Sequence, residues 1–132
     1  MKRFFLVPAL AIAALISASP GAFAYAYAYG PATVSCDATI TSTLNTVSHV
    51  TNGNMYFNQY TSTSPAITST VWAVSSNGNP LRQQNVANGG SAPWTSVLAS
   101  TYTFKTHPAT SVNCNGPLPG DGNSTLQYVI TY

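Results

Sequence analysis

Apolar and polar residues alternate along several short segments of the chain. The clearest are residues 32–41 and the segment 124–132, "STLQYVITY", where every second residue is apolar. A period of two is typical of a strand that has one face in a core and the other in solvent. In the first segment the face expected to point inward carries Val34, Cys36, Ala38 and Ile40.

Turn-forming residues separate further segments with this pattern. Strands are expected at residues 44–50, 55–62, 66–75, 81–87 and 94–104, the last as one strand or a bulged pair, with loops at 88–93 and 115–123. The short turn at residues 51–54 favours a hairpin between the second and third strands. Trp72, between Val71 and Val74, is expected in the core.

Helical periodicity is absent from the sequence beyond residue 24. Short strands at regular spacing, separated by turn signals, are typical of a β-sandwich. We therefore predict one all-β domain over residues 32–132, a small β-sandwich with an immunoglobulin-like arrangement as the candidate, preceded by an extended N-terminal strand and hinge at residues 25–31.

The first 24 residues have the three-part pattern of a secretory signal peptide. Lys2 and Arg3 precede an apolar run at residues 4–17, and residues 22–24, "AFA", form an A-x-A cleavage site; the triplets at 24–26 and 26–28 fit as well. The apolar run is too short for a membrane span. We therefore expect a secreted, extracellular protein without a membrane anchor.

Charged residues are few beyond the expected cleavage site. Arg82 and Lys105 balance Asp37 and Asp121, so the formal charge of +2 comes from the signal peptide. A protein without a basic surface cannot release the counterions of nucleic acid phosphates, and it has no attraction to anionic lipid. Neither nucleic acids nor membranes are expected partners.

Residues suited to catalysis or metal binding are also few. An acid–base pair would need both aspartates, and Asp121 lies in "PGDGN", where a turn explains it. His49 and His107 lack the local spacing of a metal site, and no serine lies in a G-x-S-x-G motif. We expect a protein that is not an enzyme and that needs no metal or cofactor.

Cys36 and Cys114 are the two cysteines of the chain. In an exported protein they are expected to form a disulfide with each other. Two buried thiols, or a bond from one cysteine to a partner chain, are the alternatives. On the chain-entropy model a bridge across so long a loop stabilises the fold by about 4 to 5 kcal/mol.

Tyr25, Tyr27 and Tyr29 alternate with alanine just before Gly30-Pro31. In a strand these tyrosines would share one face, and Gly30-Pro31 would separate the strand from the domain. Three arrangements fit: an edge strand of the domain's own sheet, a disordered leader, or a donor strand that completes the sheet of a partner. Alternation with tyrosine disfavours disorder, whereas main-chain bonds would give a donor strand its affinity.

The layout of the chain resembles the small adaptor subunit of the umbrella toxin particles secreted by filamentous soil bacteria. The similar features are the signal peptide, the neutral strand with Tyr25, Tyr27 and Tyr29, the Gly30 hinge, and a Thr/Ser-rich β domain with one cysteine pair. The resemblance covers nearly the whole chain. It implies that the tyrosines insert into repeats of a large toxin-bearing protein, while the β domain holds a lectin-like subunit.

A free carbohydrate- or small-ligand-binding β-sandwich is the alternative. Trp94 follows the expected loop "NGGSAP", and its ring is either part of the core or a face on which a sugar stacks beside asparagine and tyrosine side chains. The N-terminal strand separates the two functions, because an adaptor needs it and an independent binding module does not.

Overall fold

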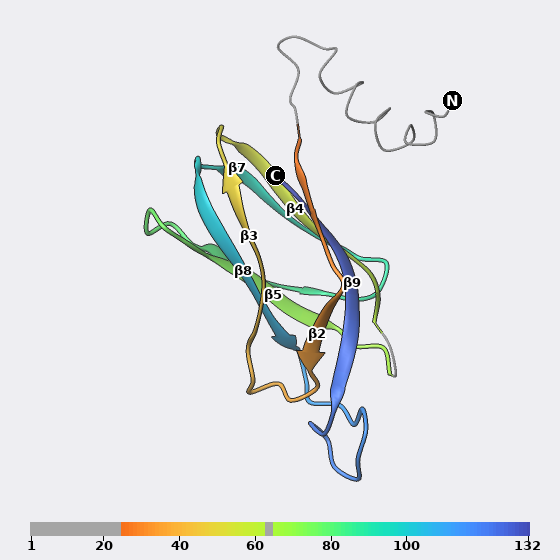
Figure 1. The fold of residues 1–132 in the computed structure, drawn as a ribbon. Helices are drawn as coiled ribbons and strands as arrows, with labels where there is room; N and C mark the ends of the chain where they lie inside the picture. Colours follow the sequence, from red (N-terminus) through yellow and green to blue (C-terminus); the bar gives the residue numbers. More distant parts are fainter. Residues whose placement is uncertain (1–24, 63–64) are drawn as a thin grey trace, which may run out of the picture.

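Within the part of the chain that the structure describes, nine strands form two antiparallel sheets that pack face to face (Figure 1). The computed structural model describes residues 25–62 and 65–132, so the predicted signal peptide lies outside the described residues. The all-β sandwich predicted from the sequence is confirmed. The strands are β1 (Tyr27–Tyr29), β2 (Ala32–Ser35), β3 (Ser42–His49), β4 (Gly53–Ser62), β5 (Ser69–Ser75), β6 (Leu81–Val86), β7 (Ser91–Val97), β8 (Ser100–Pro108) and β9 (Asn123–Thr131).

The strand order is that of a jelly roll. One sheet has the order β2-β9-β4-β7 and the other β3-β8-β5-β6, which is the two-sheet, eight-strand arrangement of jelly rolls. The additional strand β1 pairs with β9 on the same side as β2. The immunoglobulin-like arrangement is not what is found: β8 and β9 lie in different sheets, whereas the last two strands of an immunoglobulin domain lie in one.

The expected hairpin between residues 44–50 and 55–62 is wrong. β3 pairs with β8, whereas β4 pairs with β7 and β9 in the other sheet. The turn at residues 51–54 therefore carries the chain across the sandwich. The segment 94–104 likewise divides between the two sheets, and β7 begins inside the expected loop at residues 88–93.

The first domain strand is shorter than predicted because of a turn at Asp37. Its Oδ1 accepts hydrogen bonds from the backbone N–H of Thr39 at 2.8 Å and from the hydroxyl of Thr39 at 2.7 Å. This is the local bonding by which aspartate starts turns, and it lowers the pKa of the Asp37 carboxyl below its usual value. Ile40, expected in the core, is 49% exposed.

The core lies between the two sheets. On the sheet that contains β4 and β9, the buried side chains alternate along each strand with side chains on the outer face. Met55 and Phe57 of β4 and Leu126 and Ile130 of β9 are completely buried. The ring of Phe57 stacks on the ring of Tyr128, with centroids 5.3 Å apart. Burial of these apolar side chains is the main contribution that favours folding.

Cys36 and Cys114 form the predicted disulfide. Cys36 directly follows β2, and Cys114 lies in the connection between β8 and β9. The bridge thus joins the first part of the domain to its longest connection, and it indicates an oxidising compartment. Among the described residues no helix has the length and apolar character needed to cross a membrane.

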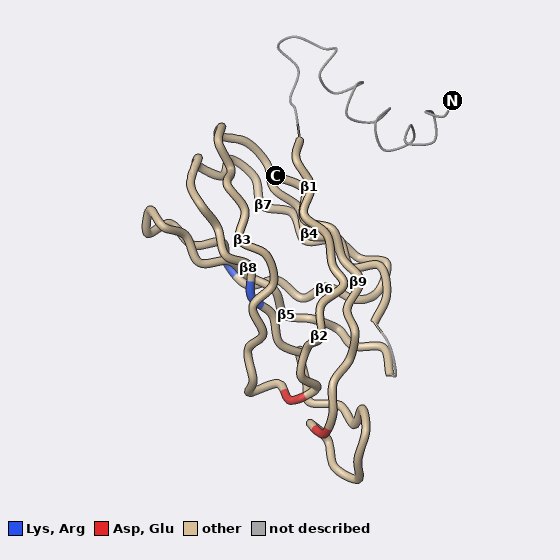
Figure 2. The backbone as a smooth tube through the Cα atoms, viewed as in Figure 1, with Lys and Arg blue, Asp and Glu red and all other residues tan. Residues whose placement is uncertain are grey.

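The charged residues of the described part of the chain lie outside the strands of the sheet that contains β1 (Figure 2). Asp37 and Asp121 are at the end of the molecule that carries the disulfide, whereas Arg82 and Lys105 belong to β6 and β8. No strand of the β1-β2-β9-β4-β7 sheet contains a charged residue. Contacts on that sheet must therefore be made by neutral groups.

Candidate functional site

β1 is an edge strand of the domain's own sheet, the first of the three arrangements considered for the tyrosine segment. It pairs with β9 over three residues, with Ala28 opposite Ile130. Just before it, Ala26 and Tyr132 exchange two backbone hydrogen bonds of 2.6 and 2.9 Å, and just after it the N–H of Gly30 donates to the carbonyl of Tyr128 at 2.9 Å. The segment is therefore held on one side by main-chain bonds.

The other side of β1 is an open sheet edge. Successive residues of an antiparallel strand direct their N–H and C=O groups to alternate sides. Because Ala26 and Gly30 bond to the β9 side, the backbone groups of Tyr27 and Tyr29 point away from β9. Among the described residues no strand pairs with β1 there. These donors and acceptors can bond to another extended chain.

The tyrosine side chains of β1 lie on the outer face of the sheet. Ala28 faces inward and packs against the core, so its neighbours Tyr27 and Tyr29 face outward, where they are 39% and 63% exposed. Their rings stack with centroids 6.3 Å apart. Thr131 lies between Tyr27 and Tyr56 in the cross-strand row, so this neutral surface continues onto β4.

Glycine is required at position 30 because the ring of Tyr128 approaches the backbone closely, and not because the backbone there has a conformation that only glycine adopts easily. It does not have the left-handed φ that favours glycine, but a Cβ at this position would lie 2.7 Å from two ring atoms of Tyr128. The peptide bond to Pro31 is cis. Gly30-Pro31 interrupts the chain between β1 and β2 without separating β1 from the domain, because both strands pair with β9.

The Gly30→Ala substitution is expected to lower the free energy of unfolding by about 1 to 3 kcal/mol, the usual effect of overpacking. The ring of Tyr128 cannot easily move away, because it stacks on Phe57 and its hydroxyl donates to Asn45 Oδ1 at 2.6 Å. Its burial also raises the pKa of the Tyr128 phenol. Urea unfolding measures the loss.

Gly53→Ala is the matched control for this substitution. A Cβ at Gly53 would meet no atom within 4 Å, and Gly53 does not have a left-handed φ. We expect a change within about 0.5 kcal/mol, as at other unconstrained surface positions. Equal losses for the two variants would contradict the role given to the Tyr128 ring.

Trp72 is not in the core, where it was expected, whereas Trp94, for which core and ligand face were both open, is in the core. Trp72 is partly buried on the outer face of its sheet, with its ring edge-on to His107 at 5.3 Å. Trp94 is 5% exposed, packs against Phe104, and donates from Nε1 to the carbonyl of Arg82 at 2.9 Å. Although it borders a surface hollow, Trp94 has no open ring face on which a sugar could stack.

The remaining candidate residues are not brought together. His107 lies at the end of β8 with Nδ1 2.7 Å from the carbonyl of Pro108, whereas His49 is 6% exposed at the end of β3. Within residues 25–62 and 65–132, no three His, Cys, Asp or Glu side chains are grouped closely enough to hold a metal ion.

The open edge of β1 could not be recognised from the sequence. Alternation marks Tyr25, Tyr27 and Tyr29 as strand residues, but only the pairing with β9 determines which backbone groups are left free. A comparison with known protein families and with curated proteins found no match.

Proposed function

We propose that the protein is a secreted, non-enzymatic adaptor of an extracellular complex, which binds a large protein partner through the strand segment Tyr25–Tyr29 and Gly30. The observation that carries the proposal is the open edge of β1. On this edge the N–H and C=O groups of Tyr27 and Tyr29 point away from β9, and no described strand covers them.

Strand addition would use both the backbone and the side chains of β1. An extended segment of the partner, placed beside β1, would bond to the free groups of Tyr27 and Tyr29, and pockets of the partner would receive their rings. Edge strands are commonly protected by charged residues, by proline or by a covering segment. The edge of β1 carries no charge, and its exposed tyrosines are of the residue type enriched at interfaces.

The layout resemblance supplies the class of partner. By this resemblance the large partner is a repeat-containing toxin protein whose repeats receive the tyrosine strand, and a lectin-like subunit is held by the β domain. The pairing of β1 with β9 covers three residues. Release of so short a strand costs less than release of a full-length one, so β1 can enter a partner either from its place on β9 or after leaving it.

Substitutions at Tyr27 test separately the contribution of the side chain and that of the backbone to binding of the partner. In Tyr27→Ser the ring is lost and the backbone N–H is kept, whereas in Tyr27→Pro the N–H on the open edge is lost as well. Neither change removes a bond to β9, because that N–H points to the other side. Tyr60→Ser, at a tyrosine of β4 that is 55% exposed, is the control.

The measurement is native purification of the secreted protein, with identification of the proteins that accompany it. We expect a large partner to accompany the natural chain and the Tyr60→Ser variant, less of it to accompany Tyr27→Ser, and none to accompany Tyr27→Pro. Circular dichroism should show the same fold for all four. If the partner is retained by Tyr27→Pro, or if the natural chain emerges alone, strand addition at β1 is wrong.

A further inference from the structure

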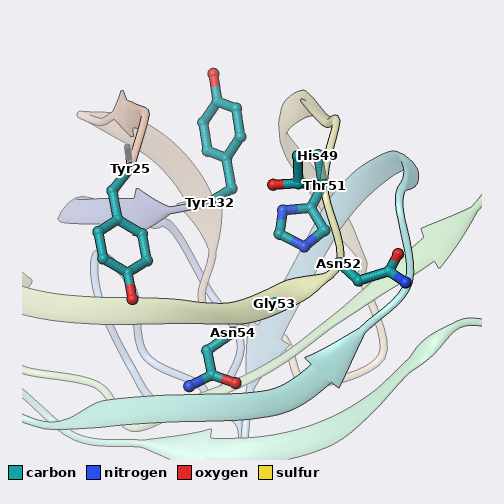
Figure 3. Close-up of a pocket in the computed structure, with 7 residues that line it drawn as sticks. All are labelled: Tyr25, His49, Thr51, Asn52, Gly53, Asn54 and Tyr132. Atoms are coloured by element: carbon teal, nitrogen blue, oxygen red, sulfur yellow. The ribbon is translucent and has the colours of Figure 1, made fainter. Parts of the chain in front are cut away.

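A cavity of about 240 Å³ lies at the end of the sandwich where the chain enters β1 and leaves β9 (Figure 3). Tyr25 and Tyr132 line it from one side, and His49, Thr51 and Asn52 line it from the other. None of the described residues that line it is charged.

The imidazole of His49 is the most unusual group in this lining. The side chain is 6% exposed, and its Nε2 has no hydrogen-bond partner among the described residues. Buried polar atoms without a partner are rare in folded proteins, because each costs free energy. The ring is held in place by an edge-on contact with Tyr102, at a centroid distance of 6.2 Å.

Two asparagines are fixed at the same cavity by the backbone of the β7–β8 region. Asn52 Oδ1 accepts a hydrogen bond from the N–H of Ala99 at 2.8 Å, and Asn54 Oδ1 accepts one from the N–H of Ser96 at 3.2 Å. Because its oxygen is engaged, Asn52 offers its Nδ2 as a donor. Fixed polar groups beside aromatic rings are typical of small-molecule sites.

We propose that this cavity binds one uncharged sugar residue. The rings of Tyr25 and Tyr132 extend in opposite directions (Figure 3), so a pyranose would stack its C–H side on one of them, while the imidazole of His49, the amide of Asn52 and the hydroxyl of Thr51 offer hydrogen bonds to its hydroxyls. The lining has no charge to balance an ionic ligand, and its size suits a single ring. The proposal does not rest on strand addition, which uses the backbone of Tyr27 and Tyr29.

Nuclear magnetic resonance of the two histidine rings tests the proposal. The probes are the methyl glycosides of glucose, galactose, mannose and N-acetylglucosamine, with glucuronic acid as the charged comparison. We expect at least one neutral glycoside to shift the ring signals of His49 and to leave those of His107 unchanged, because His107 is not part of the cavity lining. Glucuronic acid should shift neither ring.

Two variants connect the shifts to the cavity. Tyr25→Ser removes one ring from a partly exposed position and should weaken binding about tenfold. His49→Gln should weaken it by at least as much, and Tyr60→Ser should leave it unchanged. The proposal is overturned if no neutral glycoside shifts His49, if His107 shifts equally, or if Tyr25→Ser binds like the natural protein. Tyr27→Pro should keep the sugar response, so failure of strand addition is a separate result.

Discussion

Replacing both cysteines with alanine is expected to lower the free energy of unfolding by about 4 kcal/mol. The Cys36–Cys114 bridge joins residues separated by 78 positions, so its loss gives the unfolded chain much additional conformational entropy. Domains of this size have a total stability of about 5 to 15 kcal/mol. The disulfide therefore accounts for a large fraction of the stability of this fold.

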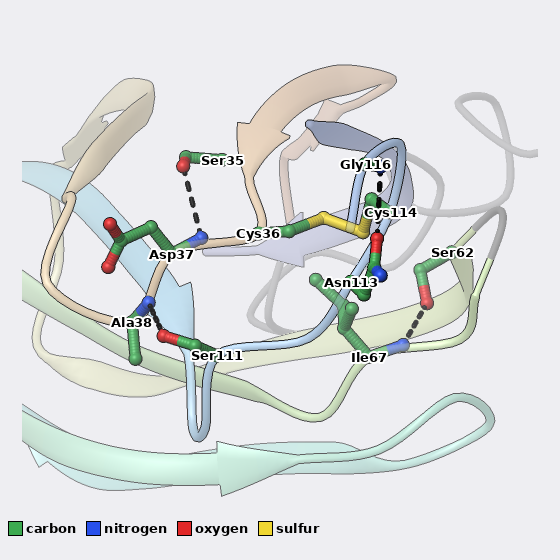
Figure 4. Close-up of a disulfide and its surroundings, with 10 residues drawn as sticks. All are labelled: Ser35, Cys36, Asp37, Ala38, Ser62, Ile67, Ser111, Asn113, Cys114 and Gly116. Atoms are coloured by element: carbon green, nitrogen blue, oxygen red, sulfur yellow. Dashed lines mark hydrogen bonds between the residues drawn. A yellow bond between two sulfur atoms is a disulfide. The ribbon is translucent and has the colours of Figure 1, made fainter. Parts of the chain in front are cut away.

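The folded structure around the bridge should survive its removal (Figure 4). The N–H of Cys36 donates to the carbonyl of Gly122 at 3.1 Å, and its carbonyl accepts from the N–H of Val112 at 3.0 Å. Ala38 is tied to the hydroxyl of Ser111 at 2.8 Å. Since these bonds hold the same segments together without sulfur, the loss of stability should come mainly from the unfolded state.

Equilibrium unfolding in urea distinguishes an effect on the unfolded state from a local distortion of the folded state. The double variant should unfold at lower urea with a larger m-value, because its unfolded chain exposes more surface than the bridged one. The natural protein, reduced with a thiol, should match the double variant. A loss below about 1 kcal/mol in the double variant would contradict the entropic account.

The disulfide also illustrates what the sequence can predict. Two cysteines in a chain that is expected to be exported leave one intramolecular pairing, and alternation in the segment 124–132 correctly places Leu126, Tyr128 and Ile130 on the buried face. Both inferences depend on local pattern or on counting. They need no knowledge of which strands are neighbours.

Strand neighbours were the part that could not be predicted. The turn at residues 51–54 has the composition of a hairpin turn, yet β3 and β4 lie in different sheets because each buries its apolar face against the opposite one. The same uncertainty affects β1. Its pattern marks it as a strand, but the open edge exists only because β9 lies on its other side.

Tryptophan placement failed for a related reason. In the run from Val71 to Val74 both parities are apolar, so alternation does not show which face is buried. In the structure Val71 and Ala73 face the core, and Trp72 is on the outside with Val74. Trp94 lies on the buried parity of β7, together with Ala92.

The Trp94→Ala substitution is accordingly expected to lower the free energy of unfolding by about 3 to 5 kcal/mol, as for other large aromatic residues truncated in a core. The indole is 5% exposed and packs edge-on against Phe104 at a centroid distance of 5.8 Å. Trp94→Phe would keep most of the volume but leave the carbonyl of Arg82 without its donor, so a loss of about 1 to 3 kcal/mol is expected.

Trp72→Ala is the matched control, because it removes the same side chain from the partly exposed outer face. A loss of about 1 kcal/mol is expected there, in the range of ordinary substitutions. Urea unfolding of the three variants gives the comparison. If Trp94→Ala were no less stable than Trp72→Ala, the indole of Trp94 would not be part of the core. It would then again be a candidate face for a stacked ligand, which the burial of Trp94 now argues against.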